Sequence, residues 1–561
     1  MLKKWNFLCD NLKSEDIASL TDKAGISQIA AVVMLNRGIG ADGGKDYLNP
    51  NRDMLLDPFL MKDMGKAVDT INGVLEKGGK ITVYGDYDID GVSSVTMLVR
   101  FLRKCGGKAE GYIPDRESEG YGLNRDALKK IKDDGTSLVI TVDNGISAIE
   151  EAQYAESIGL QMVITDHHTC GDIIPSAAAV VNPKRRDCEY PFKELAGAGV
   201  CFKLISALSG DQNAMLDMFG EYVALATIAD VVPLTNENRV LAGIGIEKMR
   251  SADIGWLRAL CDVSKIEKEK LDSYNIGFML APRINAAGRI GTAYDALSLF
   301  MSNNYEEALP FAQKLDSENI RRKEIGNNIY EEALSIAQRP GYENKKVWVL
   351  AKENWHPGII GISASRLADT YNKNVFLLSL SDGEAKGSGR GVRGFNLFDA
   401  LKNCKDLLLK YGGHELAAGV SLSEENIEEF DSRINEYADR VLSEGDMVSC
   451  VDIDCRLSCR GSLLRLFNEL QKFEPFGTGN PKPVFAVIDA KVITVKQSRD
   501  GKHLLLTFEK NGNRFSAIGF SMGDMAEAVS SAEKISIAAL LDKNEFMGKV
   551  SPQFKILDMK M

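Results

Sequence analysis

Three apolar segments of this chain run directly into carboxylates, and this repeated arrangement constrains the fold more than any other feature. The segments cover residues 81–84, 138–142 and 162–165, and they are rich in the branched residues of strands that are covered on both faces. The polar residues that follow are Asp86, Asp88 and Asp90 after the first, Asp143 after the second, and Asp166, His167 and His168 after the third. Because parallel strands deliver their carboxyl ends to one edge of a sheet, these side chains are expected to meet in one crevice.

The spacing of these segments predicts an α/β fold. Amphipathic helical stretches separate them, and a fourth strand is predicted at residues 178–181, as in β-α-β units that carry a mostly parallel sheet. A mainly helical stretch follows over residues 191–255. Between residues 310 and 338, apolar residues recur about one helical turn apart, which predicts a long helix that joins this lobe to a second one.

The rest of the chain predicts a second α/β lobe and a β-rich end. Strands are expected at residues 484–488, 491–495, 503–508, 514–520 and 535–541, after a helix near residues 463–473. Hairpin signals at Asp500-Gly501 and Asn511-Gly512 fit a small five-stranded barrel such as an OB-fold. The expected parts are an N-terminal segment packing on the first lobe (1–70), the first lobe (71–309), the connecting helix (310–340), the second lobe (341–445) and the barrel (446–561).

The clustered carboxylates predict a site for divalent metal, because such groups repel one another strongly unless cations neutralise them. Mixed carboxylate and imidazole ligands suit manganese or magnesium better than structural zinc, and manganese is the first choice. A further carboxylate, Asp230, follows an apolar helical run and precedes Pro233, so a helix stop there would aim it at the same crevice. Two ions about 4 Å apart, bridged by a carboxylate, would activate a water for attack on phosphorus.

A structural role is the alternative for each of these residues taken alone. An Asp at a strand end is commonly a turn former or a helix cap, and adjacent histidines also occur as solvated or core residues. Four acid-bearing segments in one predicted lobe favour the metal site over these separate explanations.

Charge and hydropathy limit the partners. The formal net charge is −11, so any nucleic-acid contact is expected in a local groove of an acidic body. No segment approaches the roughly 20 apolar residues of a membrane span, and a cytoplasmic protein is therefore expected.

Four motifs in this order resemble those of the DHH phosphoesterase superfamily. They lie at residues 84–91 (YGDYDIDG), 141–146 (TVDNGI), 166–168 (DHH) and 229–234 (ADVVPL). Within the superfamily the chain looks like the bacterial exonucleases specific for single strands, on motifs at residues 281–289 (APRINAAGR), 355–358 (WHPG), 387–390 (GSGR), 412–414 (GGH) and 476–483 (FGTGNPKP). One short motif is weak evidence, whereas the full ordered set is highly specific.

The resemblance implies hydrolysis of single-stranded DNA from its 5′ end to mononucleotides, in DNA repair and recombination. It places two Mn²⁺ or Mg²⁺ ions in the first, DHH lobe, which with the second, DHH-associated lobe would flank a narrow channel. Carried over by motif, the metal ligands are Asp88, Asp90, Asp143, His167 and Asp230, with Asp143 as the bridge. His168 is expected as a catalytic group near the phosphate, and Asp86 as a residue that orients its neighbours.

The resemblance also implies contacts to the substrate. Arg116, Ser388 and Arg390 match positions that hold the terminal 5′ phosphate, for which a guanidinium fork is well suited. His414 is expected to act in catalysis by donating a hydrogen bond to the scissile phosphate. The neighbouring Gly412 and Gly413 would let backbone amides approach the same phosphate. Asn285, Arg289 and His356 are expected contacts in the DNA groove. The alternatives are an exposed surface charge for each arginine and a mere turn for the glycines.

Two other functions stay open at this point. One is a DHH phosphodiesterase that acts on short oligonucleotides or cyclic dinucleotides, and the other is a non-catalytic DNA-binding relative. The expected partner is single-stranded DNA, with a single-strand-binding protein and a helicase as candidate protein partners, and the chain is expected to be a monomer. The barrel would bind the strand through a basic groove, although a purely structural role is its alternative.

Overall fold

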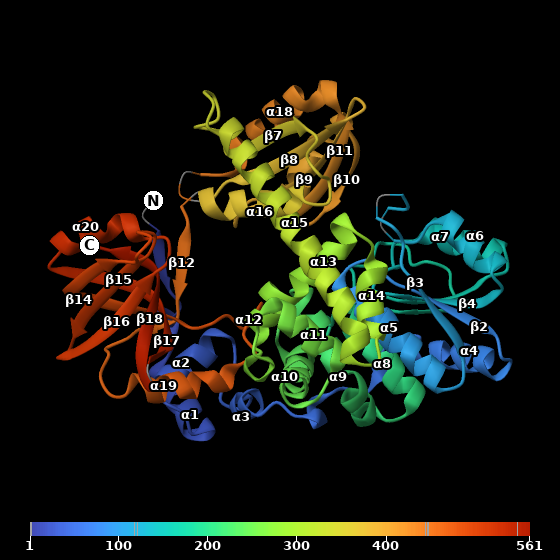
Figure 1. The fold of residues 1–561 in the computed structure, drawn as a ribbon, viewed down its shortest axis with the longest axis horizontal. Coiled ribbons are helices and arrows are strands. Elements are labelled where there is room, and N and C mark those ends of the chain that lie inside the picture. Colours follow the sequence, from blue (N-terminus) through green and yellow to red (C-terminus); the bar gives the residue numbers. More distant parts are fainter. Residues whose placement is uncertain (1–2, 117, 121, 444, 446–447, 547) are drawn as a thin grey trace. The chain divides into compact units, whose positions relative to one another are not determined.

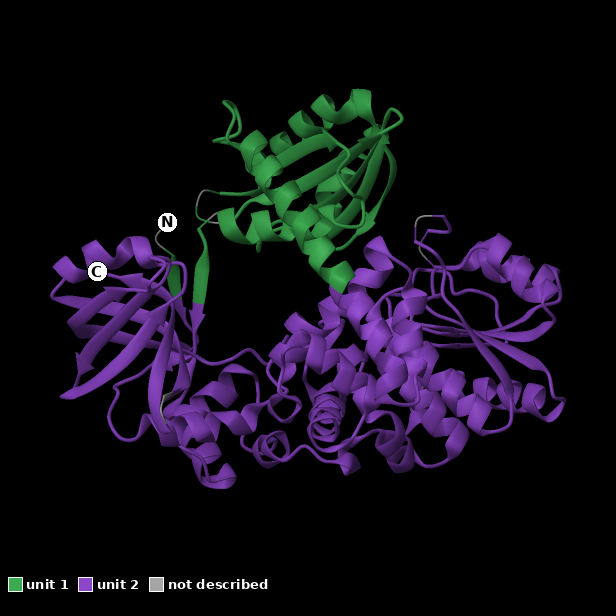
Figure 2. Cartoon of the chain, viewed as in Figure 1, with its two compact units in different colours: residues 1–5, 317–451 green, residues 6–316, 452–561 purple. Residues whose placement is uncertain are grey.

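The structure is a computed structural model that describes residues 3–116, 118–120, 122–443, 445, 448–546 and 548–561 (Figure 1). The chain forms two compact units, coloured separately in Figure 2. Unit 1 comprises residues 1–5 and 317–451, and unit 2 comprises residues 6–316 and 452–561. The expected domain limits at residues 1 and 446 lie outside the described residues.

Unit 2 contains the parallel sheet that the acidic strand ends predicted. Its order is β3-β2-β4-β5-β6, and every neighbouring pair is parallel. The strands are β2 (Lys80–Tyr84), β3 (Lys108–Tyr112), β4 (Thr136–Val142), β5 (Gln161–Thr165) and β6 (Ala179–Val181). Four of them were predicted. The edge strand β3, with the sequence KAEGY, was missed because it lacks a run of branched apolar residues.

Helices cover both faces of this sheet. On one face α4 (Met64–Glu76), α5 (Ile89–Lys104) and α8 (Gly197–Ser209) share a core with Ile81, Val83 and Ile140. On the other face α6 (Arg125–Asp133) and α7 (Ile149–Ser157) pack on Val139 and Ile164. Alternate strand residues therefore face opposite helical layers, as in a doubly covered sheet.

The remaining helices of the first lobe complete its larger core. They are α9 (Gln212–Ala229), α10 (Asn236–Ser251), α11 (Gly255–Ser264), α12 (Ser273–Asn275), the π-helix η5 (Ile276–Leu280), α13 (Ala281–Ile290) and α14 (Ala293–Met301). Among the described residues, no helix is both long enough and apolar enough to cross a membrane.

The N-terminal segment is divided between two cores. Residues of α1 (Ser14–Ala24), α2 (Gln28–Asn36) and α3 (Gly44–Leu48) pack with the barrel, whereas residues from Leu55 onwards join the core of the parallel sheet. The expectation that all of residues 1–70 pack on the first lobe is therefore wrong for α1 to α3. Their apolar residues, including Leu20 and Met34, fill the core beside α19 (Leu463–Leu470).

The C-terminal part forms the predicted closed barrel. Its five strands are β14 (Val484–Gln497), β15 (Leu504–Lys510), β16 (Asn513–Gly519), β17 (Lys534–Phe546) and β18 (Lys549–Lys560), and a β14–β17 pairing closes it. The two strands predicted at 484–495 are one strand with an irregularity between Val487 and Ala490, where Asp489 has φ +50°. The last strand, β18, was not predicted. The Asn511-Gly512 turn has positive φ at both residues, as a two-residue hairpin requires.

The last 21 residues of a long helix (317–337) and a mixed sheet account for most of unit 1. The helix α15 (Tyr305–Ala337) begins five residues before its predicted start, because Asn304 accepts a hydrogen bond from the Glu307 amide at its N-terminus. The sheet has the order β10-β11-β9-β8-β7, and only β7 and β8 run parallel. Its elements are β7 (Val347–Glu353), α16 (Ile360–Tyr371), β8 (Asn374–Ser381), β9 (Glu384–Arg390), α17 (Leu397–Lys402), β10 (Leu408–Gly413), β11 (Ala417–Ser423) and α18 (Ile427–Val441).

Candidate metal centre

The loop after β2 delivers three carboxylates to the end of the sheet. Asp88 caps α5, because its side chain accepts hydrogen bonds from the amides of Asp90 and Gly91 at 2.9 and 3.1 Å. Gly91 is required here, since a Cβ atom would collide with the backbone of Asp86. The tight turn keeps Asp86 and Asp90 buried and directs all three acids to one edge.

Asp90 is held by the first turn of another helix. Its two carboxylate oxygens accept hydrogen bonds from the amides of Gly197 and Ala198, each at 2.7 Å, at the start of α8. The positive end of a helix dipole stabilises such a carboxylate. The two amides therefore fix the orientation of an acid that is fully buried.

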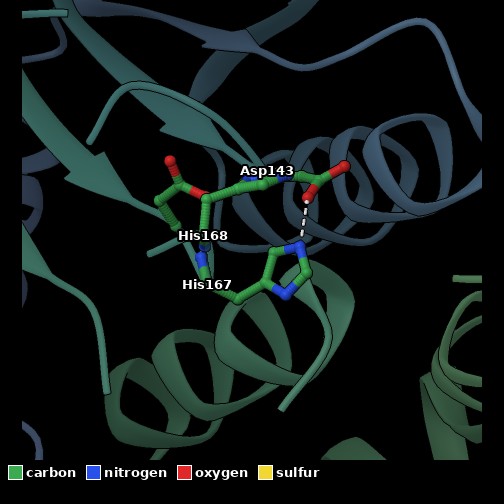
Figure 3. Close-up of side chains that lie close together, drawn as sticks. Asp143, His167 and His168 are labelled. Carbon is green, nitrogen blue, oxygen red and sulfur yellow. Dashed lines mark hydrogen bonds and ion pairs between the residues drawn. The ribbon is translucent and has the colours of Figure 1, made fainter. Parts of the chain in front are cut away.

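Three side chains converge on the imidazole of His167, which follows β5. Its Nε2 atom lies 3.1 Å from Asp143 Oδ1, 3.7 Å from Asp230 Oδ2 and 3.9 Å from Asp90 Oδ2. Figure 3 shows the ring of His167 directed at the Asp143 carboxylate. Asp143 follows β4 with φ +61°, and Asp230 ends α9. The acids predicted from four separate segments are thus brought together.

The donor atoms of this cluster fit a metal ion. Asp143 Oδ1 and both ring nitrogens of His167 are buried without a hydrogen-bond partner. Leaving buried polar atoms unpaired is costly, and a cation would satisfy them. Potential ligand atoms form three groups, each lying within 4.8 Å. The groups are Asp143, Asp166, His167 and His168; Asp90, His167 and Asp230; and Asp86, Asp88 and Asp143.

The electrostatics of the cluster point to the same conclusion. Burial and the neighbouring Asp88 raise the pKa of Asp86 to about 8 and that of Asp90 to about 7. Burial and the charge of Asp90 raise the pKa of Asp230 to about 8, and they also raise that of Asp143. Burial lowers the pKa of His167 to about 3, so its ring is neutral and able to bind a metal. These carboxylates would ionise readily only when cations are bound.

Asp166 and His168 form a hydrogen-bonded pair within this cluster, next to Asp143 and His167. Asp166 accepts hydrogen bonds from the amides of Ile146, His167 and His168 and from His168 Nδ1, at distances of 2.7 to 3.1 Å. Although burial alone would lower the pKa of His168, the bond to Asp166 raises it to about 9. His168 therefore carries a positive charge at neutral pH, and its side chain is 46% exposed.

The first-lobe residues predicted to bind substrate surround the same loop. The Arg116 guanidinium lies over the Tyr87 ring, 5.0 Å from its centre, and Tyr87 stands between Asp86 and Asp88. Asn285 Oδ1 accepts a hydrogen bond from the Ile89 amide at 2.8 Å, so this side chain also supports the metal-binding loop. Arg289 lies in the last turn of α13, next to Gly288, where a Cβ atom would collide with the Tyr87 carbonyl oxygen.

Unit 1 holds a second candidate site around Arg390. Arg390 donates to Ser365 Oγ at 3.1 Å, to Ser388 Oγ at 2.9 Å and to the Gly389 carbonyl at 2.7 Å. In the described part of the chain no carboxylate pairs with this guanidinium, and burial lowers its pKa. A partly buried arginine without an acid is typical of a site that binds an anion.

The other predicted residues of unit 1 lie in two loops. His356 precedes α16, and its Nδ1 atom accepts a hydrogen bond from the Gly358 amide at 3.1 Å. Gly412 and Gly413 end β10, and His414 is exposed in the turn that follows. Gly413 has φ +135° and abuts the backbone of Ala417, which explains the glycine at this position.

Sequence reasoning missed the two amides that hold Asp90. Gly197 and Ala198 lie more than one hundred residues away along the chain, and backbone donors carry no side-chain signature. The one local signal is the small-residue run of residues 196–199 (AGAG) before an apolar helix, which permits close approach of the helix end.

Comparison with known families divides the chain in the same way as its fold. Residues 80–229 match the DHH family, N-terminal domain. Residues 344–440 match the DHHA1 domain, and residues 453–558 match the RecJ OB domain. These matches cover the parallel sheet with the acidic cluster except Asp230, the mixed sheet, and most of the barrel.

Curated relatives and solved structures extend over nearly the whole chain. A "single-stranded-DNA-specific exonuclease RecJ" from Bacillus subtilis is 38% identical over 549 residues, which are 97% of this chain and 69% of that protein. The protein of the same name from Escherichia coli is 34% identical, over 88% of this chain and 89% of that one. The crystal structure of Thermus thermophilus RecJ with Mn²⁺ matches with a TM-score of 0.86 at 29% identity, covering 100% of this chain and 79% of that one. A Mg²⁺ complex from the same organism gives 0.81 at 28% identity, covering 100% and 78%.

Proposed function

The chain belongs to the RecJ family of single-stranded-DNA-specific exonucleases and is a metal-dependent nuclease of that class. We propose that it degrades a DNA strand from the 5′ end to mononucleotides. The observation that carries this proposal is the buried cluster of carboxylates around His167, whose donor atoms suit Mn²⁺ or Mg²⁺. Its family members have been crystallised with either ion.

We propose that Asp88, Asp90, Asp143, His167 and Asp230 hold two ions, with Asp143 as the bridge. The position of Asp143 supports this role, because it belongs to a group with Asp86 and Asp88 and also contacts His167, which belongs to the two other groups. When bound, such ions lower the pKa of a water and neutralise the charge that develops on the phosphate. Asp86 is proposed to orient its neighbours, since its side chain bonds to the Tyr87 amide within the same loop.

The protein's own side chains would then handle protons and charge. His168 is held protonated by Asp166, so it is suited to donate a hydrogen bond to a phosphate oxygen or to give a proton to the leaving oxygen. His414 is exposed and is proposed as a second donor to the scissile phosphate, helped by the backbone amides of Gly412 and Gly413.

Polarity is proposed to come from an anchor for the terminal phosphate. Ser388 and Arg390 supply a hydroxyl and a guanidinium without an acidic partner, and Arg116 supplies a further guanidinium beside the metal-binding loop. An anchored end phosphate one nucleotide from the ions would set both the direction of digestion and the size of the product. Asn285, Arg289 and His356 are proposed to contact the strand that leads to this point.

An end-labelled digestion tests the proposal. A single strand labelled at its 3′ end should be degraded to near completion with Mn²⁺ and released as mononucleotides, whereas a blunt duplex should be spared and a chelator should stop the reaction. Entry from the 3′ end would overturn the polarity. Hydrolysis confined to dinucleotides or cyclic dinucleotides would favour the other DHH phosphodiesterases.

The two protein partners, a single-strand-binding protein and a helicase, are predictions. A single-strand-binding protein and a helicase would supply the strand to an exonuclease that excludes duplexes, and size-exclusion chromatography would check the predicted monomer. Binding of single-stranded DNA itself is consistent with the RecJ OB domain at residues 453–558.

A further inference from the structure

An exposed aromatic patch begins at the residue that follows Asp230 in the chain. Its exposed residues are Val231, Tyr274, Phe278 and Lys482, and they border a cavity of about 430 Å³ that the buried ring of Phe476 also lines. Val231 is the residue next to Asp230, so the patch begins one residue from a predicted metal ligand. All of it belongs to unit 2, with contributions from the end of α9, from α12 and η5, and from the segment that leads into the barrel.

Two rings of this patch are stacked and open to solvent. The centres of the Tyr274 and Phe278 rings are 4.9 Å apart, with 28° between their planes. Tyr274 is 53% exposed and Phe278 is 71% exposed. Large aromatic side chains are usually buried, so a stacked pair in solvent marks a surface that binds something. Their flat faces are suited to a flat, apolar partner.

The backbone of Val231 supports a functional origin for the patch. Val231 has φ +62°, which a β-branched residue rarely adopts, and its side chain is 66% exposed. A glycine would fit this helix end without strain, and an exposed isopropyl group adds nothing to the core. The strain is therefore tolerated for a purpose other than folding, as is common beside active sites.

The patch also carries a positive charge. The Lys482 ammonium lies 6.0 Å from the centre of the Tyr274 ring and 6.0 Å from that of Phe476. Glu474 interacts electrostatically with Lys482 and offsets part of this positive charge. The aromatic rings can stack on a base, and the lysine beside them can form an ion pair with a phosphate. An apolar peptide would not need the ion pair.

We propose that the aromatic patch binds bases of the single-stranded substrate by stacking on Tyr274 and Phe278, within a few nucleotides of the scissile phosphate. The proposal rests on the proposed function, since it takes the strand at the metal centre as the occupant. Stacking accepts every base, so the patch would hold the strand in place without imposing a sequence preference. Bases of a duplex are paired and stacked on each other, so the patch would also favour single strands.

Binding without cleavage tests this inference. Oligo-dT strands that carry one 2-aminopurine at successive positions from a 5′ phosphate are titrated with the full-length protein in a chelator, and fluorescence and affinity are read. The 2-aminopurine should be quenched at one or two positions, and Tyr274→Leu with Phe278→Leu should remove that quenching. The double variant should bind about tenfold to a hundredfold more weakly, as the loss of base stacking predicts. Leucine keeps the apolar bulk, so this loss would report the rings themselves.

Matched variants separate stacking from general damage. Phe59→Leu alters another exposed aromatic, 54% accessible, in η3 (Pro58–Leu60) of the same unit, and should leave binding unchanged. Phe278→Trp should keep affinity and quenching, because it retains a stacking face. Val231→Gly should raise the melting temperature and weaken DNA binding, a combination that misfolding cannot produce.

The outcomes are distinct from those of the digestion assay. Wild-type affinity and quenching in the double leucine variant would overturn the aromatic patch as a base-binding site, even if the enzyme digests DNA normally. Equal weakening by Phe59→Leu would overturn it as well. Position-dependent quenching that the leucine variants remove would support the patch, even if the 5′ polarity proved wrong.

Discussion

The substitution Gly197→Ala should disturb the proposed metal centre, because it adds a methyl group that collides with Asp143. A Cβ atom at this position would lie 2.6 Å from both Cβ and Oδ1 of Asp143, about 0.8 Å inside the 3.4 Å at which ordinary contacts begin. The Gly197 amide would still be able to donate to Asp90, so the change is mainly steric. Asp143 is only 2% exposed and has little room to retreat, so its carboxylate must move.

The size of the effect follows from this overlap. Forcing a methyl group into a packed site costs about 1–3 kcal/mol of stability. A misplacement of about 1 Å in a reacting group lowers turnover about 100-fold. Gly197→Ala should therefore bind Mn²⁺ more weakly in titration calorimetry and digest a labelled single strand about two orders of magnitude more slowly, with a modest fall in the melting temperature.

Gly199→Ala provides the control on the same helix. Its Cβ would lie 3.2 and 3.3 Å from atoms of the Leu195 side chain, which needs to give by only a few tenths of an ångström. Alanine is also preferred over glycine in a helix by about 1 kcal/mol. This variant should keep its metal affinity and activity. If Gly197→Ala also bound Mn²⁺ and cleaved DNA like the wild type, the placement of Asp143 at the metals would be refuted.

Three further predictions concern the same chemistry. Asp143→Asn should abolish digestion while gel-shift affinity for single strands in a chelator stays within a few fold of wild type, and normal turnover would remove Asp143 from the site. Arg390→Ala should weaken binding of 5′-phosphorylated strands by about tenfold or more, as loss of a charge-assisted phosphate contact predicts, with little effect on 5′-hydroxyl strands; an equal loss on both would contradict its role. The chelated protein should become less stable as pH rises from about 4 to 8, because folding raises the pKa of Asp86 to about 8 and of Asp90 to about 7, so the fold favours their protonated forms. Mn²⁺ should bind more tightly as the pH rises over the same range. Melting temperatures measured at several pH values, with and without Mn²⁺, check both expectations. A melting temperature of the chelated protein that does not change with pH would contradict the raised pKa values of these acids.

The sequence predicted the positions of residues that depend on the order of the parallel strands. It did not predict features that depend on packing between segments far apart in the chain. Asp86, Asp143 and His167 could be placed together because parallel strands share one carboxyl edge. Strand β3 escaped prediction because its KAEGY sequence is half polar, and tertiary pairing with β2 overrides that weak propensity. The division of the N-terminal segment between two cores was missed for a related reason, since an apolar helix face does not reveal which core it joins.

Asp143 and Asp166 are chemically alike and both buried in the first lobe, but their surroundings give them different properties. Asp166 receives four hydrogen bonds, and these hold its pKa below the usual value although burial opposes them. Its two oxygens are held by protein donors, and one of them also lies within 4.8 Å of ligand atoms of Asp143, His167 and His168. Asp143, equally buried, has an oxygen without any donor and a raised pKa, so a cation is needed to stabilise its charge. The first residue of the Asp-His-His motif therefore stabilises the protonated form of His168, whereas the ring of the second, His167, lies against Asp143.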